Sequence, residues 1–120
     1  NKVEGFGIGF FTKYGDGGVD ISPIGDLAKS EVYCLAKHLN IIDDILKAEP
    51  TDGLWQDGRT DVDQIGASYE EIEWAINNLN REQESLNETE KRVIKLYKNI
   101  NKQNKHKMNP IPVCFIPQKN

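Results

Sequence analysis

The sequence lacks several features that mark common classes of protein. It contains no run of about 18 apolar residues, so no membrane-spanning helix is predicted. Basic residues do not predominate, because 15 lysines and arginines stand against 19 aspartates and glutamates, for a net charge of −4. General nucleic-acid-binding domains are usually basic, so this charge balance argues against that class of protein. The first residues include neither an initiator methionine nor a signal-peptide pattern, and we expect the chain to begin inside a longer protein.

Cysteine and histidine are scarce as well. Cys34 and Cys114 lie far apart without metal-type spacing, so we expect reduced thiols in a cytoplasmic protein, with a disulfide between them as the less favoured alternative. Neither His38 nor His106 has a cysteine or another histidine at motif spacing, so the sequence supports neither a zinc site nor a Ser-His-Asp triad. The phosphate-binding pattern Gly-x-x-x-x-Gly-Lys-Ser/Thr is also absent.

The densest group of chemically useful residues lies at 10–24, where the sequence reads FFTKYGDGGVDISPI. Its glycines let the backbone turn and approach a ligand closely. Residues 19–21 are predicted to form a short strand that ends before Pro23. Residues 4–11 alternate glycine with apolar side chains, which predicts a short, closely packed helix or strand. This part of the chain, with the loops that meet it, is the expected place of an active site.

The rest of the sequence predicts helices joined by polar segments. Asp26 is the expected N-cap of a helix with one buried face, formed by Val32, Leu35, Ala36 and Leu39. A short helix at 42–48 is expected to turn Ile42, Ile45 and Leu46 inward and to end before Pro50.

Two capping boxes predict further helices, one at Ser68 with Glu71 and one at Asn87 with Glu90. Their expected inward faces are Ile72, Ala75, Ile76 and Leu79 in the first helix, and Val93, Leu96, Tyr97 and Ile100 in the second. Residues 51–66 are predicted to be a long acidic loop, a kind of segment that is usually a functional lid or disordered. The tail at 110–120 is expected to be extended.

Several residues are candidates for binding phosphate or metal. Lys29 lies in the first turn of a predicted helix, where free N–H groups favour anions, although a helical lysine is more often a solvated surface residue. Thr51 opens the long loop, and a plain turn hydroxyl is the alternative. Glu4, Asp16 and Asp20 are candidate ligands for Mg²⁺, with turn hydrogen bonding as the alternative for Asp16 and solvation for Glu4.

Two other charged groups have weaker interpretations. Asp57, Asp61 and Asp63 suggest Ca²⁺, but their spacing does not match an EF-hand loop. Residues 91–107 contain seven lysines and arginines, which most often means one solvated helix face. Gripping a phosphate of a ligand or partner is the alternative for that run.

Longer segments of the sequence, covering almost the whole chain, resemble one family in order and spacing. The segments are NKVE at 1–4, GFFTKYGDGGVDISPI at 9–24, DLAK at 26–29, EPTDGLW at 49–55, TDVDQIG at 60–66, SYEEI at 68–72 and HK at 106–107. They closely resemble the ammonia-dependent NAD synthetases, and FTKYGDG is the most specific of the matching runs.

The resemblance implies a reaction and a fold. The family amidates nicotinic acid adenine dinucleotide with ammonia, using ATP and Mg²⁺, through an adenylated carboxylate, and releases AMP and pyrophosphate. Its fold is an α/β ligase domain of the adenine-nucleotide alpha-hydrolase-like, Rossmann-like type, of which this chain would be the helix-rich C-terminal half with little strand. Its members are homodimers, and we expect a cytoplasmic enzyme with neither nucleic acid nor membrane as a partner.

The resemblance also implies roles for single residues. Glu4 matches the Mg²⁺ ligand, and Lys29 and Thr51 match contacts with the ATP phosphates. Four residues match contacts with the dinucleotide: Lys13, Asp20, His106 and Lys107. Asp16 falls beside the reacting carboxyl group, where it would position or deprotonate ammonium, so Asp16 and Lys29 are the expected catalytic residues.

The family's pyrophosphatase loop, Ser-Gly-Gly-x-Asp-Ser, does not occur in the sequence. We therefore expect residues 1–120 to be the C-terminal part of one synthetase domain and to be inactive alone. Three alternatives stay open at this point: the synthetase portion of a glutamine-dependent enzyme, a catalytically dead dimerisation module, and a small helical nucleic-acid binder.

Overall fold

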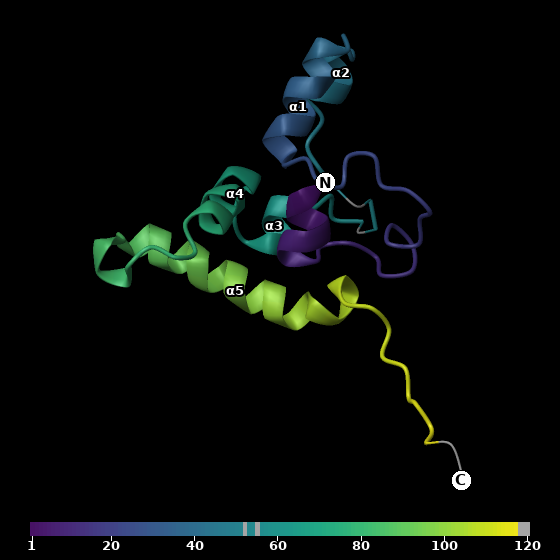
Figure 1. The fold of residues 1–120 in the computed structure, drawn as a ribbon. Coiled ribbons are helices and arrows are strands. Elements are labelled where there is room, and N and C mark those ends of the chain that lie inside the picture. Colours follow the sequence, from purple (N-terminus) through teal and green to yellow (C-terminus); the bar gives the residue numbers. More distant parts are fainter. Residues whose placement is uncertain (52, 55, 118–120) are drawn as a thin grey trace.

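The computed structural model describes residues 1–51, 53, 54 and 56–117, and the fold over these ranges is helical (Figure 1). The elements in chain order are a π-helix η1 (Val3–Ile8), α1 (Lys29–His38), α2 (Asp43–Leu46), α3 (Asp61–Ile65), α4 (Tyr69–Asn77), a short 3₁₀-helix η2 (Gln83–Ser85) and α5 (Glu88–Met108). No strand occurs within the described residues, which confirms a helix-rich piece. Asp52, Trp55 and residues 118–120, which belong to the expected loop and tail, lie outside them.

The strand predicted at 19–21 is wrong. These residues have no regular structure, and the side chains of Val19 and Ile21 are 58% and 76% exposed. A strand is stabilised by ladder hydrogen bonds to a neighbour, and the described residues supply none here. The prediction of a helix or strand at 4–11 is confirmed as a helix, since η1 occupies residues 3–8.

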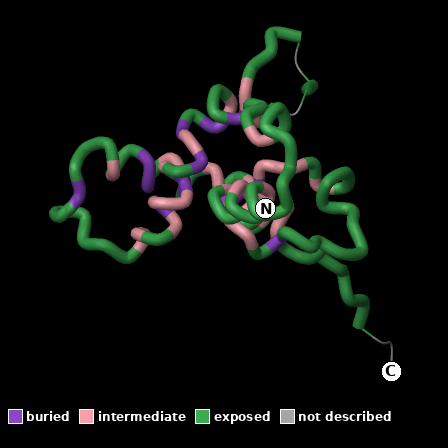
Figure 2. Tube along the Cα trace, turned by 90° about the horizontal axis from the view of Figure 1, so that it is seen from above, coloured by how far each residue is buried: buried purple, intermediate pink, exposed green. Residues whose placement is uncertain are grey.

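The core lies where η1, α4 and α5 pack against one another (Figures 1 and 2). Its fully buried large side chains are Val3, Ile8, Ile72 and Val93. The predicted inward faces of α4 and α5 are confirmed: Ile72, Ala75, Val93 and Tyr97 are buried, and Ile76, Leu79, Leu96 and Ile100 pack against them. This core fixes the position of η1, on which Glu4 lies.

The C-terminal half of α5 closes the end of η1. The last carbonyls of a helix have no partner within it and need donors from elsewhere. Asn101 donates to the carbonyl of Gly7 at 2.6 Å, and Asn104 to that of Ile8 at 2.9 Å. Lys107 donates to the carbonyl of Gly9 at 3.1 Å. α5 therefore holds η1 through hydrogen bonds as well as through the core.

The two predicted capping boxes are confirmed, and the structure contains a third. Ser68 with Glu71 begins α4, and Asn87 with Glu90 begins α5. Thr60 with Asp63 begins α3, which lies within the loop predicted at 51–66, so the described irregular part of that loop ends at Thr60. The sequence interpretation missed α3 because the helix is only five residues long and shows no apolar periodicity.

The predictions for α1 and α2 are partly wrong. α1 begins at Lys29 with Ala28 as N-cap, while Asp26 instead forms an exposed ion pair with Lys2 at 3.1 Å. Its predicted buried face contains no buried residue, with Leu35 40% and Leu39 60% exposed. The predicted inward side chains of α2 are also uncovered, including Ile42 and Ile45 at 62% and 63%. α1 and α2 contact each other, and Ser30 at the start of α1 hydrogen-bonds to Glu73 of α4, but both helices otherwise stand away from the core in Figure 1.

Two further expectations concern the tail and the cysteines. Residues 110–117 have no regular structure and are exposed, as predicted for the described part of the tail. Cys34 and Cys114 are free thiols, so the disulfide alternative has no support.

None of the helices among the described residues has the length and apolarity needed to cross a membrane.

The N-cap of α5 gives a first test of the fold. Asn87 accepts a hydrogen bond from the backbone of Glu90 at 2.9 Å, and Glu90 accepts one from the backbone of Asn87 at 2.7 Å. Asn87→Ala is expected to lower the free energy of unfolding by about 1 kcal/mol, because it removes a cap acceptor. Chemical denaturation of the full-length protein measures this change. Asn99→Ala, at an exposed position of the same helix, is the control, and an equal loss there would contradict the assignment.

Candidate functional site

Four side chains from four separate elements meet at one end of η1. The hydroxyl of Tyr69 lies 2.5 Å from Glu4 Oε1 and 2.7 Å from Asp61 Oδ2. The ammonium of Lys29 lies 3.3 Å from the same Glu4 Oε1 and 4.8 Å from the centre of the Tyr69 ring. Glu4 belongs to η1, whereas Lys29, Asp61 and Tyr69 are the first residues of α1, α3 and α4. We call these four residues the Glu4 cluster.

The Glu4 cluster is shielded from water. Asp61 and Tyr69 are both 7% exposed, and the side chains of Lys29 and Glu4 are 19% and 24% exposed. Burial first, and then the hydrogen bonds to Glu4 and Asp61, raise the pKa of Tyr69 far above its ordinary value of 10.0, so the phenol stays protonated. An uncharged phenol thus stands between two carboxyl groups, and the positive charge of Lys29 lies beside one of them, Glu4.

A cavity of about 340 Å³ opens on one side of the Glu4 cluster. Four of the sequence-predicted site residues line it: Glu4, Lys13, Asp16 and Lys107. Phe6, Phe10 and Phe11 supply apolar walls. The cavity thus offers two cations and two carboxylates beside aromatic surface, a combination that suits a ligand with both phosphates and a ring.

Two interactions position the charged residues of this cavity. Lys107 donates to the carbonyl of Phe11 at 3.0 Å, and its ammonium lies 5.8 Å from the centre of the Phe11 ring. Asp16 accepts a hydrogen bond from the backbone of Thr12 at 3.2 Å. The turn role considered for Asp16 is therefore present in the structure, and Asp16 also forms part of the cavity wall.

A second cavity, of about 310 Å³, lies on the side of α1 and brings together Lys29 and Thr51. The Thr51 hydroxyl donates to the carbonyl of Arg59 at 3.3 Å and accepts from the backbone of Gly53 at 3.2 Å. Lys29 is therefore at once a wall of this cavity and a partner of Glu4, which lines the other one. The Glu4–Lys29 contact joins the two cavities.

Two of the predicted site residues are not brought to either cavity. Asp20 is exposed in the irregular segment after the glycines, and His106 is exposed in the last turn of α5. Their roles stay predictions.

The residues also allow a test of the implied Mg²⁺ site. No group of three or more histidine, cysteine, aspartate or glutamate side chains suited to a metal occurs among the described residues. Mg²⁺ usually needs only one or two protein carboxylates, because it keeps waters and takes phosphate oxygens from a nucleotide. Glu4 fits that role, because it lines the larger cavity and its Oε1 is held by Tyr69 and Lys29.

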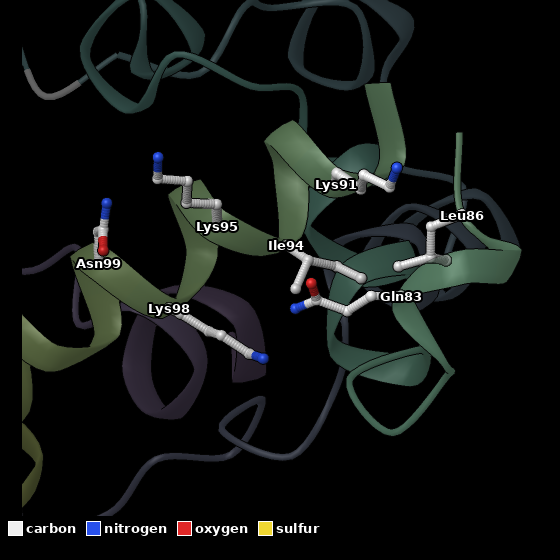
Figure 3. A pocket seen from close by; sticks show the side chains of 7 residues that line it. All are labelled: Gln83, Leu86, Lys91, Ile94, Lys95, Lys98 and Asn99. Atoms are coloured by element: carbon white, nitrogen blue, oxygen red, sulfur yellow. The ribbon is translucent and has the colours of Figure 1, made fainter. Parts of the chain in front are cut away.

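The basic run of α5 does not form a comparable site. Lys91, Lys95 and Lys98 line a groove of about 290 Å³ above Leu86 and Ile94. Lys91 is paired with Glu88 at 2.9 Å. In Figure 3 the three ammonium groups point in different directions and do not converge on one point. The interpretation of residues 91–107 as a solvated helix face therefore describes this groove better than a phosphate-binding site does.

The cap of α3 predicts a pH dependence near the cluster. Hydrogen bonds from the backbone N–H and hydroxyl of Thr60, both at 2.8 Å, lower the pKa of Asp63 below its ordinary value of 3.8. A carboxyl whose pKa is lower in the folded state stabilises that state above the unfolded pKa, and this stabilisation is lost as pH falls through the folded value. The urea midpoint of the wild type should therefore fall more steeply than that of Asp63→Asn between about pH 5 and about pH 2. Parallel curves for the two proteins would contradict the cap.

The comparisons with known proteins place this geometry in a family. The family model described as NAD synthase matches residues 1–111. The chain belongs to the NAD synthase family. An NH(3)-dependent NAD(+) synthetase of Archaeoglobus fulgidus is 38% identical over 116 residues, which is 97% of this chain and 44% of that protein. A second, of Methanococcoides burtonii, is 54% identical over 66 residues, which is 55% of this chain and 25% of that protein.

A solved structure agrees with these relatives. The structure of NMN synthetase from Francisella tularensis superimposes with a TM-score of 0.79 at 31% identity, over 97% of this chain and 44% of that one. The fold is therefore that of the NAD synthase family, as expected from the sequence, and the chain represents a helix-rich part of it. The chain spans less than half the length of each of these three proteins.

The sequence interpretation missed the joint role of Asp61 and Tyr69. Asp61 was considered as one of three aspartates for Ca²⁺ and as part of a matching segment, and Tyr69 only as part of a matching segment. Asp61 and Tyr69 are the first residues of helices whose N-caps are Thr60 and Ser68. The capping box at Ser68 predicted the position of Tyr69, and the one at Thr60 could have predicted that of Asp61. Their meeting with Glu4 depends on tertiary packing, which no local pattern reports.

Proposed function

We propose that the chain is the C-terminal part of the synthetase domain of an ammonia-dependent NAD synthetase. The reaction would be the ATP-dependent amidation of nicotinic acid adenine dinucleotide. Family membership supports the reaction class, and the single observation that carries the proposal is the contact of Lys29 with Glu4 between the two cavities. It offers a place where a carboxylate bound on one side can meet a phosphate bound on the other.

The chemistry requires such a meeting. A carboxylate resists attack by ammonia because it is already an anion with a poor leaving group. An oxygen of the nicotinate carboxylate attacks the α-phosphorus of ATP, the bond to pyrophosphate breaks, and a mixed anhydride with AMP forms. Ammonia then adds to the acyl carbon, AMP leaves with that oxygen, and a proton is lost to give the amide. Holding both substrates in adjoining cavities makes the first step effectively unimolecular.

The proposed roles follow the cavities. Lys29 and Thr51 bind phosphates of ATP in the smaller cavity, and Lys29 offsets the charge that builds up on them. Lys13 and Lys107 bind the dinucleotide in the larger cavity, with Asp20 and His106 as further contacts made when the ligand is present. Asp16 orients ammonium and accepts its proton.

Mg²⁺ would be held by Glu4 together with phosphate oxygens, and when bound it would neutralise charge on the polyphosphate. Lys29, which contacts the same carboxylate, would keep Glu4 oriented before the nucleotide arrives. We further propose a cytoplasmic homodimer that has neither nucleic acid nor membrane as a partner. Because the chain spans only 44% of its Archaeoglobus relative, the 120 residues alone should be inactive.

An assay of product formation tests the proposed function. The full-length protein is incubated with the deamido dinucleotide, ATP, Mg²⁺ and ammonium, and NAD and AMP are quantified by chromatography. We expect NAD and AMP in equal amounts from the full-length protein and none from the 120-residue chain. NAD formation by the 120-residue chain would contradict the assignment of this chain as half of a site. No NAD from the full-length protein with any nitrogen donor would favour a dead dimerisation module.

Two further arms separate the close alternatives. Replacing ammonium with glutamine distinguishes the ammonia-dependent enzyme from a glutamine-dependent one, which would use both. Replacing the dinucleotide with nicotinic acid mononucleotide tests a second substrate, because the structural neighbour from Francisella tularensis is named an NMN synthetase. We expect the dinucleotide to be preferred, since the sequence relatives named above are NAD synthetases.

A further inference from the structure

We propose that Tyr69 and Asp61 are positioning residues for this reaction, which fix the Glu4 carboxylate and the Lys29 ammonium at the wall between the two cavities. The inference rests on the proposed function, because the two residues act through the groups assigned to Mg²⁺ and ATP. Neither Tyr69 nor Asp61 lines either cavity. They therefore lie behind the cavity walls, next to the groups that form them.

The hydrogen-bond geometry shows that the arrangement is not simply good packing. Tyr69 has one hydroxyl proton, yet oxygens of two carboxylates lie 2.5 and 2.7 Å from its oxygen. Asp61 is almost completely buried, and a buried carboxylate is costly unless it is well paired. Apolar side chains of similar volume would usually give an equal or higher stability at such a site. A polar cluster of this kind is therefore better explained by the groups it orients than by the stability it adds.

Tyr69 reaches both substrate-facing groups at once. Its hydroxyl lies 2.5 Å from Oε1 of Glu4, which lines the larger cavity. Its ring lies under the Lys29 ammonium at 4.8 Å, a cation–π distance. One side chain thus sets the position of the carboxylate and of the lysine, and the 3.3 Å contact between those two groups follows.

Asp61 connects this arrangement to the loop that carries Thr51. Its Oδ2 lies 2.7 Å from the Tyr69 hydroxyl, and its backbone N–H donates to the carbonyl of Pro50 at 3.0 Å. Pro50 directly precedes Thr51, the second residue of the smaller cavity proposed to bind phosphate. The backbone of Asp61 is thus tied to the loop just before Thr51, and its side chain ties the same residue to Tyr69, so a change of that side chain should affect ATP rather than the dinucleotide.

The test compares two buried tyrosines in the full-length protein. Tyr69→Phe removes the bridging hydroxyl, and Tyr97→Phe removes the hydroxyl of a second core tyrosine, 9% exposed, which belongs neither to the Glu4 cluster nor to the wall of either cavity. Calorimetric titration with ATP and Mg²⁺, without dinucleotide, should show affinity about 10-fold lower for Tyr69→Phe, the size typical of lost outer-shell support. The Mg²⁺ concentration for half-maximal activity should rise by a similar factor of about 10. The KM for the dinucleotide should stay within about twofold, and Tyr97→Phe should match the wild type.

Asp61→Asn keeps the test valid if Tyr69→Phe does not fold. It preserves the shape of the side chain and is expected to weaken ATP binding about threefold to tenfold with an unchanged KM for the dinucleotide. Equal ATP affinity and equal Mg²⁺ dependence in wild type and both variants would overturn the positioning roles. Absence of NAD synthesis in the wild type would overturn the proposed function instead. The calorimetric comparison decides the positioning roles separately, because it needs no turnover.

Discussion

Lys29→Ala is expected to reduce NAD synthesis by the full-length protein about 100-fold or more in kcat/KM for ATP, a typical loss when one group that stabilises developing charge is removed. Lys29 lines the smaller cavity and contacts Glu4 at 3.3 Å, so its removal takes away a phosphate partner and leaves Glu4 without its cation. Steady-state rates at varied ATP and at varied dinucleotide measure the effect. The KM for the dinucleotide should change much less than the ATP parameters.

Lys37→Ala is the matched control for this substitution. Lys37 lies on the same helix, in its last turn, and is exposed away from both cavities. The same loss of charge and side-chain length there should leave kcat/KM unchanged. Equal losses at positions 29 and 37 would show that the effect comes from α1 as a helix and would contradict a phosphate contact by Lys29.

Gly9→Ala is expected to lower the free energy of unfolding by about 3 kcal/mol, which combines backbone strain with overpacking. Gly9 ends η1 with φ of +63°, in the left-handed region that side chains rarely adopt. A Cβ built there lies 2.6 Å from the Cβ of Asn104, an atom close to the backbone of α5 that cannot move aside cheaply. The clash also disturbs the hydrogen bond from Asn104 to the carbonyl of Ile8.

Gly58→Ala separates the two parts of that cost. Gly58 has φ of +69°, almost the same as Gly9, but a Cβ there meets nothing within 4 Å. It should therefore cost only the backbone part, about 1 kcal/mol. Urea or thermal denaturation of both variants measures the difference. Equal destabilisation by the two substitutions would show that α5 does not pack on the end of η1 as described.

The local parts of this fold could be predicted from sequence, and the tertiary parts could not. The capping boxes at Ser68 and Asn87 and the apolar spacing of α4 and α5 are short-range signals, and both helices form where those signals predicted them. The apolar faces of α1 and α2 show what apolar spacing alone does not predict. Apolar spacing predicted that Leu35 and Leu39 are buried, but burial depends on a covering element, and the described residues leave the two side chains 40% and 60% exposed.

The candidate site divides in the same way. Glu4, Lys13, Lys29 and Thr51 were selected by chemistry and resemblance, and the structure places all four in cavity walls. Asp61 and Tyr69 act on Glu4 and Lys29 from helices that are far away in the sequence. Their hydrogen bonds are set by the packing of α4 against η1, so the pattern of residues alone carried no signal for that meeting.

The central claim is that the nicotinate carboxylate is adenylated by ATP where the two cavities adjoin. It is tested most directly by following one oxygen atom of that carboxylate. The full-length protein is given deamido dinucleotide labelled with ¹⁸O in the nicotinate carboxylate, together with ATP, Mg²⁺ and ammonium, and the products are analysed by mass spectrometry. The account predicts one labelled oxygen in AMP for each NAD formed, with unlabelled pyrophosphate. Label in orthophosphate with release of ADP, or NAD formation with unlabelled AMP, would contradict it.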